Sequence, residues 1–343
     1  MKYNSLDKYK RISKRLSDNQ KSVLNVIDCS KQINRLVEDN QEFYLLGVKN
    51  TEYINEEVLE KLDNKNFIKH TIDKMSLGGR AVDIDLINPI TGKIMTGSSS
   101  GTAINVLNGF NDIGIGTDGG GSVLAPAMAL NLYGIISPLF YRDEAFKKSS
   151  TDGIKFVPAI GFISKDIELI KKAVGIFVNQ EKVEKIKVLI PEVSNIYLET
   201  KQDIGKTVID NLVVNDKISL TKSEFPNIFL EREGLITFLE NELNTYDAII
   251  TYEGPIDYYG FGDSVFGLFN DIAKADQQKA GKGLIRVANM ANKSALVVPS
   301  NDFSSGYVII SNSTKKGVQT LFELEALLSN KLNNKLYDRY FTL

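Results

Sequence analysis

Residues 116–122 read Gly-Thr-Asp-Gly-Gly-Gly-Ser, and this stretch decides the fold of the chain, together with Gly-Ser-Ser-Ser-Gly at residues 97–101. Consecutive glycines let several backbone N–H groups approach one small anion, because no side chain obstructs them. Ser122 ends the glycine turn, so its hydroxyl is expected to lie beside those donors. The stretch therefore predicts a serine nucleophile next to an oxyanion hole.

A serine hydroxyl needs a base before it can act as a nucleophile. The chain has a single histidine, His70, and its sequence neighbours carry no nucleophile motif. We therefore expect no Ser-His-Asp triad. A lysine can accept a proton when burial lowers its pKa. Lys49 follows the apolar residues Leu45, Leu46 and Val48, which makes it the candidate base.

Other interpretations of these segments stay open at this stage. Residues 97–101 alone are typical of a flexible linker, and a lysine after an apolar strand can simply mark the end of that strand. Residues 114–119 match the dinucleotide fingerprint G-x-G-x-x-G. However, residues 108–112 do not read as a buried strand and Pro126 limits helix growth afterwards, so we disfavour a dinucleotide site.

Composition indicates a soluble globular protein with a sizeable core, since 43% of the 343 residues are hydrophobic and 24% are charged. The net charge of −2 argues against nucleic acid or an anionic membrane as a partner. The single cysteine, Cys29, excludes an internal disulfide and a cysteine metal cluster, and we expect it to be a buried thiol.

Residues 1–19 are charged throughout and contain no apolar segment of a signal peptide. No apolar run approaches the roughly 20 residues that a membrane span requires. These features predict a cytoplasmic protein.

Hydrophobic periodicity predicts helices that alternate with strands. Residues 1–40 are predicted to be helical, because Val23, Val26, Ile27, Ile33 and Leu36 recur near a 3.6-residue period. Further helices are predicted at residues 55–62, 101–107, 126–132, 167–177 and 319–328, and buried strands at residues 43–48, 186–190, 248–251, 295–298 and 307–310. This alternation favours an α/β arrangement layered around one sheet.

Several motifs resemble those of the amidase signature family. Residues 96–102 resemble its Gly-Gly-Ser-Ser-Gly-Gly-Ser motif, and residues 114–127 resemble its Gly-Thr-Asp-x-Gly-Gly-Ser-Ile-Arg-x-Pro-Ala block. Ser98 and Ser122 are 24 positions apart, which is the spacing of that family. Weaker similarities cover the motifs Val-Lys-Asp, Gly-Leu-Lys-Pro and Ala-Asn-Leu-Ala-Gly, at residues 48–50, 134–138 and 288–292.

The resemblance, which runs from about residue 43 to 330, implies an amidase-signature fold with a mixed central β-sheet covered by helices on both faces. It implies one domain over residues 1–343, with a helical N-terminal segment at 1–40 and a core at 41–343. Ser122 would be the nucleophile, Ser98 a proton relay at a cis peptide bond, and Lys49 the base. The other residues given roles are the oxyanion donors Gly119, Gly120 and Gly121, and the supporting residues Ser99, Thr117 and Asp118.

The implied activity is hydrolysis of the C–N bond of a small-molecule or peptide amide through an acyl-enzyme, with no metal or organic cofactor. The alternative is a catalytically altered or partner-dependent member that acts as a subunit of a larger complex, including an amidotransferase-like subunit. A protein partner or a homodimer is compatible with either.

The chain also departs from the family pattern. Leu124 stands where some members carry an arginine that pairs with a substrate carboxylate, so we expect a preference for uncharged amides. Arg286 is a possible substitute cation. Ser100 replaces a glycine, Asn50 replaces an aspartate, and the interval from Lys49 to the first serine cluster is short.

Overall fold

The structure, a computed structural model, describes residues 2–16, 20–179, 181–333, 337 and 340–341. Its α-helices are α1 (Lys2–Leu16), α2 (Ser30–Glu38), α3 (Glu56–Asp63), α4 (Ser100–Leu107), α5 (Leu124–Ala129), α6 (Ile167–Val174), α7 (Ile204–Asn211), α8 (Arg232–Glu242), α9 (Asp271–Gln278) and α10 (Lys315–Ala326). Short 3-10 turns are η1 (Leu77–Gly79), η2 (Glu144–Phe146), η3 (Phe266–Leu268) and η4 (Leu284–Arg286).

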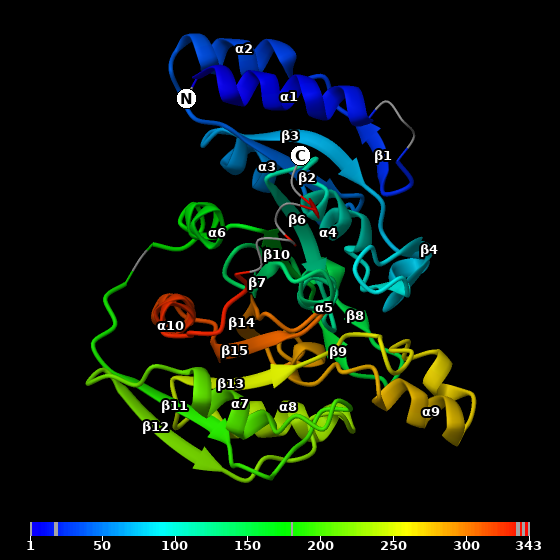
Figure 1. The fold of residues 1–343 in the computed structure, drawn as a ribbon, viewed down its shortest axis with the longest axis vertical. Helices are drawn as coiled ribbons and strands as arrows, with labels where there is room; N and C mark the ends of the chain where they lie inside the picture. The colour runs from blue at the N-terminus through cyan, green and yellow to red at the C-terminus, as the bar shows by residue number, and fades with distance from the viewer. Residues whose placement is uncertain (1, 17–19, 180, 334–336, 338–339, 342–343) are drawn as a thin grey trace.

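The strands form one long sheet and two small hairpins (Figure 1). They are β1 (Val23–Val26), β2 (Tyr44–Lys49), β3 (Phe67–Asp73), β4 (Val82–Ile87), β5 (Ile94–Thr96), β6 (Ile113–Asp118), β7 (Tyr133–Ser137), β8 (Lys148–Ser149), β9 (Lys155–Phe156), β10 (Ala159–Ser164), β11 (Ile186–Pro191), β12 (Ile218–Ser223), β13 (Ala248–Glu253), β14 (Lys293–Pro299) and β15 (Gly306–Asn312).

The long sheet has eleven strands in the order β1-β3-β2-β6-β10-β7-β14-β15-β13-β11-β12. It is mixed: β3, β2 and β6 run parallel to one another at one end, and β13, β11 and β12 do so at the other. The strands between these groups pair antiparallel. The remaining pairs, β4 with β5 and β8 with β9, are separate two-stranded hairpins.

Helices flank both faces of this sheet. Every residue of β6, β10 and β13 is buried, which requires a cover on each side of the strands. In Figure 1, α6 and α10 lie on one side of the central strands and α4 and α5 on the other. The mixed α/β fold predicted from the sequence is confirmed.

The predicted helices and strands after residue 40 are confirmed with small changes at their ends, but the prediction of a helix throughout residues 1–40 is wrong. Residues 23–26 form β1, which pairs antiparallel with β3. Leu24 and Val26 are largely exposed, so their hydrophobicity does not mark a helix face. The edge of β3 offers unpaired backbone groups, and pairing with them overrides the helical periodicity. As predicted, Cys29 is buried, in a small cluster with Ile33 and Leu36.

The first residues of the segment 116–122 lie inside β6, a strand that the sequence analysis did not predict. Gly114, Gly116 and Thr117 belong to β6, and the turn begins only after Asp118. A Cβ atom on Gly116 would approach Ser99 Oγ to 2.5 Å. Glycine at this position therefore lets the segment before α4 pack directly against the strand, which brings the two serine clusters together. Among the described residues, no helix is both long and apolar enough to cross a bilayer.

Candidate active site

Residues of the two glycine-serine segments, 97–101 and 116–122, line one cavity of about 320 Å³ together with Lys49. Strands β2 and β6 pair in parallel and end at Lys49 and Asp118, so their carboxyl ends deliver both motifs to the same edge of the sheet. Of the residues predicted from the sequence, those that line the cavity are Lys49, Ser98, Thr117, Gly119, Gly120 and Ser122.

The Lys49 amine lies between Ser98 and Thr117. Its Nζ is 2.6 Å from Ser98 Oγ, 2.9 Å from Thr117 Oγ1 and 3.1 Å from the Thr117 carbonyl oxygen. The side chain comes from a buried strand, and the whole residue is only 3% exposed. Three oxygen atoms therefore hold the amine in place, and one of them is the hydroxyl that the proposed proton relay needs.

Burial lowers the pKa of Lys49 to about 7. The positive charge of Lys148 lowers this pKa further, while the carboxylate of Asp118 raises it. Desolvation dominates because the charged ammonium loses its water shell inside the protein. A lysine with a pKa near 7 is partly neutral at physiological pH and can accept a proton.

Asp118 shapes the turn that presents Ser122. Its carboxylate accepts hydrogen bonds from the N–H groups of Gly121 (2.7 Å), Val123 (2.6 Å) and Leu124 (3.2 Å). Gly121 has a φ of +94°, a conformation that a side chain would strain. The carboxylate and this glycine together turn the chain sharply between β6 and α5.

The Gly121 N–H is already committed to Asp118, so it is a weaker candidate for the oxyanion hole than Gly119 and Gly120, which line the cavity. Behind the cavity wall, the Ser99 N–H donates to the Ser122 carbonyl oxygen at 3.1 Å and joins the two clusters. The buried Ser99 hydroxyl has no hydrogen-bond partner within the described part of the chain.

The expected cis peptide bond at Ser98 is wrong. Within the described ranges, the one cis bond precedes Pro255. Instead, Gly97 turns the chain with a φ of +72°, and this turn brings Ser98 to Lys49 without a cis bond.

His70 does not line this cavity. It is fully buried, and its Nδ1 is 3.1 Å from the Phe110 carbonyl oxygen and 3.0 Å from Asn111 Oδ1. Burial lowers its pKa. Across the described residues, no group of three or more His, Cys, Asp or Glu side chains is arranged to hold a metal ion.

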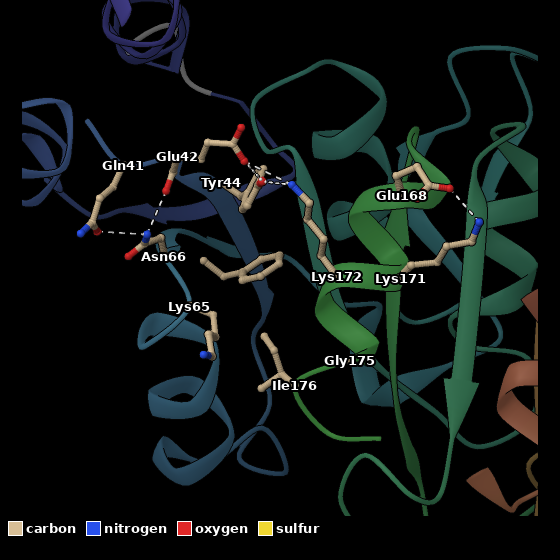
Figure 2. Close-up of a pocket in the computed structure, with 11 residues that line it drawn as sticks. Gln41, Glu42, Tyr44, Lys65, Asn66, Glu168, Lys171, Lys172, Gly175 and Ile176 are labelled. Atoms are coloured by element: carbon tan, nitrogen blue, oxygen red, sulfur yellow. Dashed lines mark hydrogen bonds and ion pairs between the residues drawn. The ribbon is translucent and has the colours of Figure 1, made fainter. Parts of the chain in front are cut away.

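A larger cavity, of about 750 Å³, lies near the opposite end of β2 (Figure 2). Its lining contains no serine, threonine, cysteine or histidine. Lys172 pairs there with Glu42 and Tyr44, and Lys171 pairs with Glu168, as the dashed lines in Figure 2 show. With no nucleophile and with these cations neutralised, this cavity is not the candidate active site.

Two residues that the sequence analysis expected near the site do not line the cavity. Leu124 is completely buried and does not line the cavity, so the expected preference for uncharged amides loses its basis. Arg286 does not line it either, because its guanidinium donates to the carbonyl oxygens of Gly283, Ile228 and Leu230.

Sequence reasoning also missed four charged residues on the cavity wall, namely Arg80, Lys148, Arg232 and Asp263. They come from segments far apart in the sequence, and no motif accompanies them.

Replacing Asp118 with alanine is expected to lower the free energy of unfolding by about 2 kcal/mol or more, because three buried N–H groups lose their acceptor. Urea denaturation measures this change. Asp216→Ala, at an exposed carboxylate without a partner among the described residues, is the control and should change stability little. Equal stability of the two variants would contradict the bracing role of Asp118.

Comparison with known proteins supports the resemblance seen in the sequence. Residues 87–198, which include both serine clusters, match the family model Amidase. No curated protein sequence matches the chain. This match and the fold agree with the resemblance to the amidase signature family.

Solved structures with a similar fold include allophanate hydrolase of Kluyveromyces lactis, with 14% identity and a TM-score of 0.64 over 95% of this chain and 70% of that one. A glutamyl-tRNA(Gln) amidotransferase subunit from Thermotoga maritima has 16% identity and a TM-score of 0.62, over 93% and 89% of the two chains. A bacterial aryl acylamidase has 11% identity and a TM-score of 0.62, over 99% of this chain and 94% of that chain. At these identities the likeness concerns the fold.

Proposed function

We propose that this protein hydrolyses the C–N bond of a linear carboxamide, with Ser122 as nucleophile, Ser98 as proton relay and Lys49 as base. The observation that carries the proposal is the contact of 2.6 Å between Lys49 Nζ and Ser98 Oγ inside the cavity that Ser122 also lines. A buried lysine with a pKa of about 7 supplies a base inside the cavity that Ser98 and Ser122 line.

In the proposed first half-reaction, neutral Lys49 takes the proton of Ser98, and Ser98 takes the proton of Ser122. The Ser122 oxygen bonds to the carbonyl carbon, and the oxyanion is stabilised by N–H groups of Gly119 and Gly120. When the C–N bond breaks, Ser98 gives a proton to the departing amine and regains one from Lys49. The products of this step are an acyl-enzyme and free ammonia or amine.

In the second half-reaction, a water molecule takes the place of Ser122. It loses a proton through Ser98 to Lys49, and its oxygen attacks the acyl carbon. The ester bond breaks, Ser122 recovers its proton by the same route, and a carboxylic acid leaves. The cycle uses only groups of this chain and one water, with protons balanced at each step.

The rival proposal is a partner-dependent subunit. It is favoured by the altered motif positions and by the fold likeness to the amidotransferase subunit from Thermotoga maritima. A fluorophosphonate probe and a screen of primary amides with ammonia detection separate the two proposals. Labelling at Ser122 with ammonia release by the isolated chain supports the hydrolase, whereas turnover only with an added partner protein supports the rival.

A further inference from the structure

We infer that the amide substrate of this site carries a carboxylate, and that Arg232 and Lys148 bind it. The inference rests on the proposed function, because it assigns a substrate class to the same cavity. It also reverses the expectation drawn from Leu124, whose side chain never reaches that cavity.

Arg232 presents one end of its guanidinium to the glycine turn. It is the first residue of α8, and its side chain is only 14% exposed. Nε and Nη2 donate to the two carboxylate oxygens of Asp152, at 2.7 and 2.5 Å, which fixes the plane of the guanidinium. Nη1 lies 3.5 Å from the point that a Cβ atom on Gly120 would occupy. This nitrogen has no acceptor among the described residues, so its N–H groups remain available to a ligand.

Lys148 supplies a second cation to the same cavity. It begins β8, it is exposed, and its ammonium has no hydrogen-bond or ion-pair partner in the part of the chain that the structure describes. Its charge reaches the reaction centre, since it contributes to the lowered pKa of Lys49.

The balance of charge around the cavity is positive although the whole chain has a net charge of −2. Arg80 and Asp263 face each other in an ion pair, and Asp152 offsets Arg232. Among the exposed cations of the lining, Lys148 has no ion-pair partner within the described residues. A ligand carboxylate would neutralise it, whereas a neutral ligand would leave it unpaired.

A second guanidinium, that of Arg286, lines a neighbouring pocket together with Arg232. Arg286 has a pKa lowered to about 10, first by burial and then by the charge of Arg232. The carboxylates of Glu253, Glu231 and Asp152 act in the opposite direction and raise the pKa of Arg286. Because Nη1 lies beside Gly120, the carboxylate and the scissile carbonyl must be only a few bonds apart. Short ω-amide acids such as succinamate have this spacing.

The test compares succinamate with its methyl ester, which differs by one charge, and measures ammonia release as kcat/KM for each. We expect the wild-type protein to prefer succinamate by about tenfold or more. Arg232→Gln and Lys148→Gln should each reduce that preference, Arg232→Gln to near unity, while Arg232→Lys should retain part of it. Lys147→Gln is the matched control, because Lys147 is an exposed neighbour outside the cavity, and it should keep the preference.

A second readout does not depend on turnover. Succinate and its neutral diamide are titrated against fluorophosphonate labelling of Ser122, and their binding is measured by calorimetry. We expect succinate to protect Ser122 at a concentration at least about tenfold lower than the diamide, and this difference should disappear in Arg232→Gln.

The failures of the two proposals are distinguishable. Equal use of the acid and the ester, or an unchanged preference in Arg232→Gln and Lys148→Gln, overturns the inference while labelling of Ser122 leaves the proposed function intact. Absence of labelling at Ser122 overturns the proposed function. In that case calorimetry still decides the inference, because tighter binding of succinate that depends on Arg232 upholds the anion site and equal binding rejects it.

Discussion

Replacing Ser122 with alanine is expected to leave less than about a hundredth of the amidase activity and no fluorophosphonate labelling, because the loss of a nucleophile ordinarily costs far more than that. The protein should still fold. The Ser122 side chain is half-buried and braces nothing, whereas the turn around it is held by the Asp118 carboxylate. The measurements are ammonia release, probe labelling and urea denaturation of the same preparation.

Ser149→Ala is the matched control for that variant. Ser149 lines the same cavity and is exposed, but it lies on β8, away from the glycine turn. Its replacement should leave labelling in place. If Ser122→Ala retains more than a hundredth of the activity in a folded protein, or if Ser149→Ala alone loses the label, Ser122 is not the nucleophile.

Replacing Lys49 is expected to be nearly as damaging, and arginine should not restore activity. Arginine stays protonated and cannot accept the relayed proton, and Lys49→Met keeps a similar length without a charge. The two variants should therefore be equally inactive, which kcat/KM for any accepted amide would measure. An active Lys49→Arg protein would show that residue 49 serves as a fixed charge instead.

The pH dependence of the rate follows from the pKa of Lys49. The base works when it is neutral, and its pKa is about 7, so kcat/KM should rise as the pH increases through about 7 and then level off. Lys148→Gln should move this rise to higher pH, because the charge of Lys148 lowers the pKa of Lys49. A rate that falls between pH 6 and pH 9 in a stable protein would contradict Lys49 as the base.

Local motifs predicted the central part of the site. The glycine turn, the apolar strand and the scarcity of histidine predict Ser122 and Lys49, whereas Ser98 is implied by the resemblance to the amidase signature family. The structure places all three residues around one cavity. Residue types at short spacing impose a backbone shape, and that shape can be inferred from the sequence without knowledge of the fold.

Features that depend on distant partners were not predictable. Residues 23–26 form a strand because the edge of β3 offers backbone groups for hydrogen bonding. The hydrophobic period of the segment itself carries no information about that distant edge. Leu124 lies two residues after Ser122 in sequence but is buried in the core, since α5 begins there and all of its residues are buried. Arg232 lies beside Gly120, although the two residues are 112 positions apart in the sequence. No local sequence pattern predicts such a contact.

The parallel ladder between β2 and β6 has a consequence for how this protein can change over evolution. In a strand, adding one residue turns every later side chain to the opposite face. An insertion between Leu46 and Lys49 would therefore turn the amine away from Ser98, even though every residue of the proposed triad would still be present. Length variation should thus be excluded from β2 and tolerated in the exposed β8–β9 turn around Gly153, where it would reshape the mouth of the cavity and leave the chemistry intact.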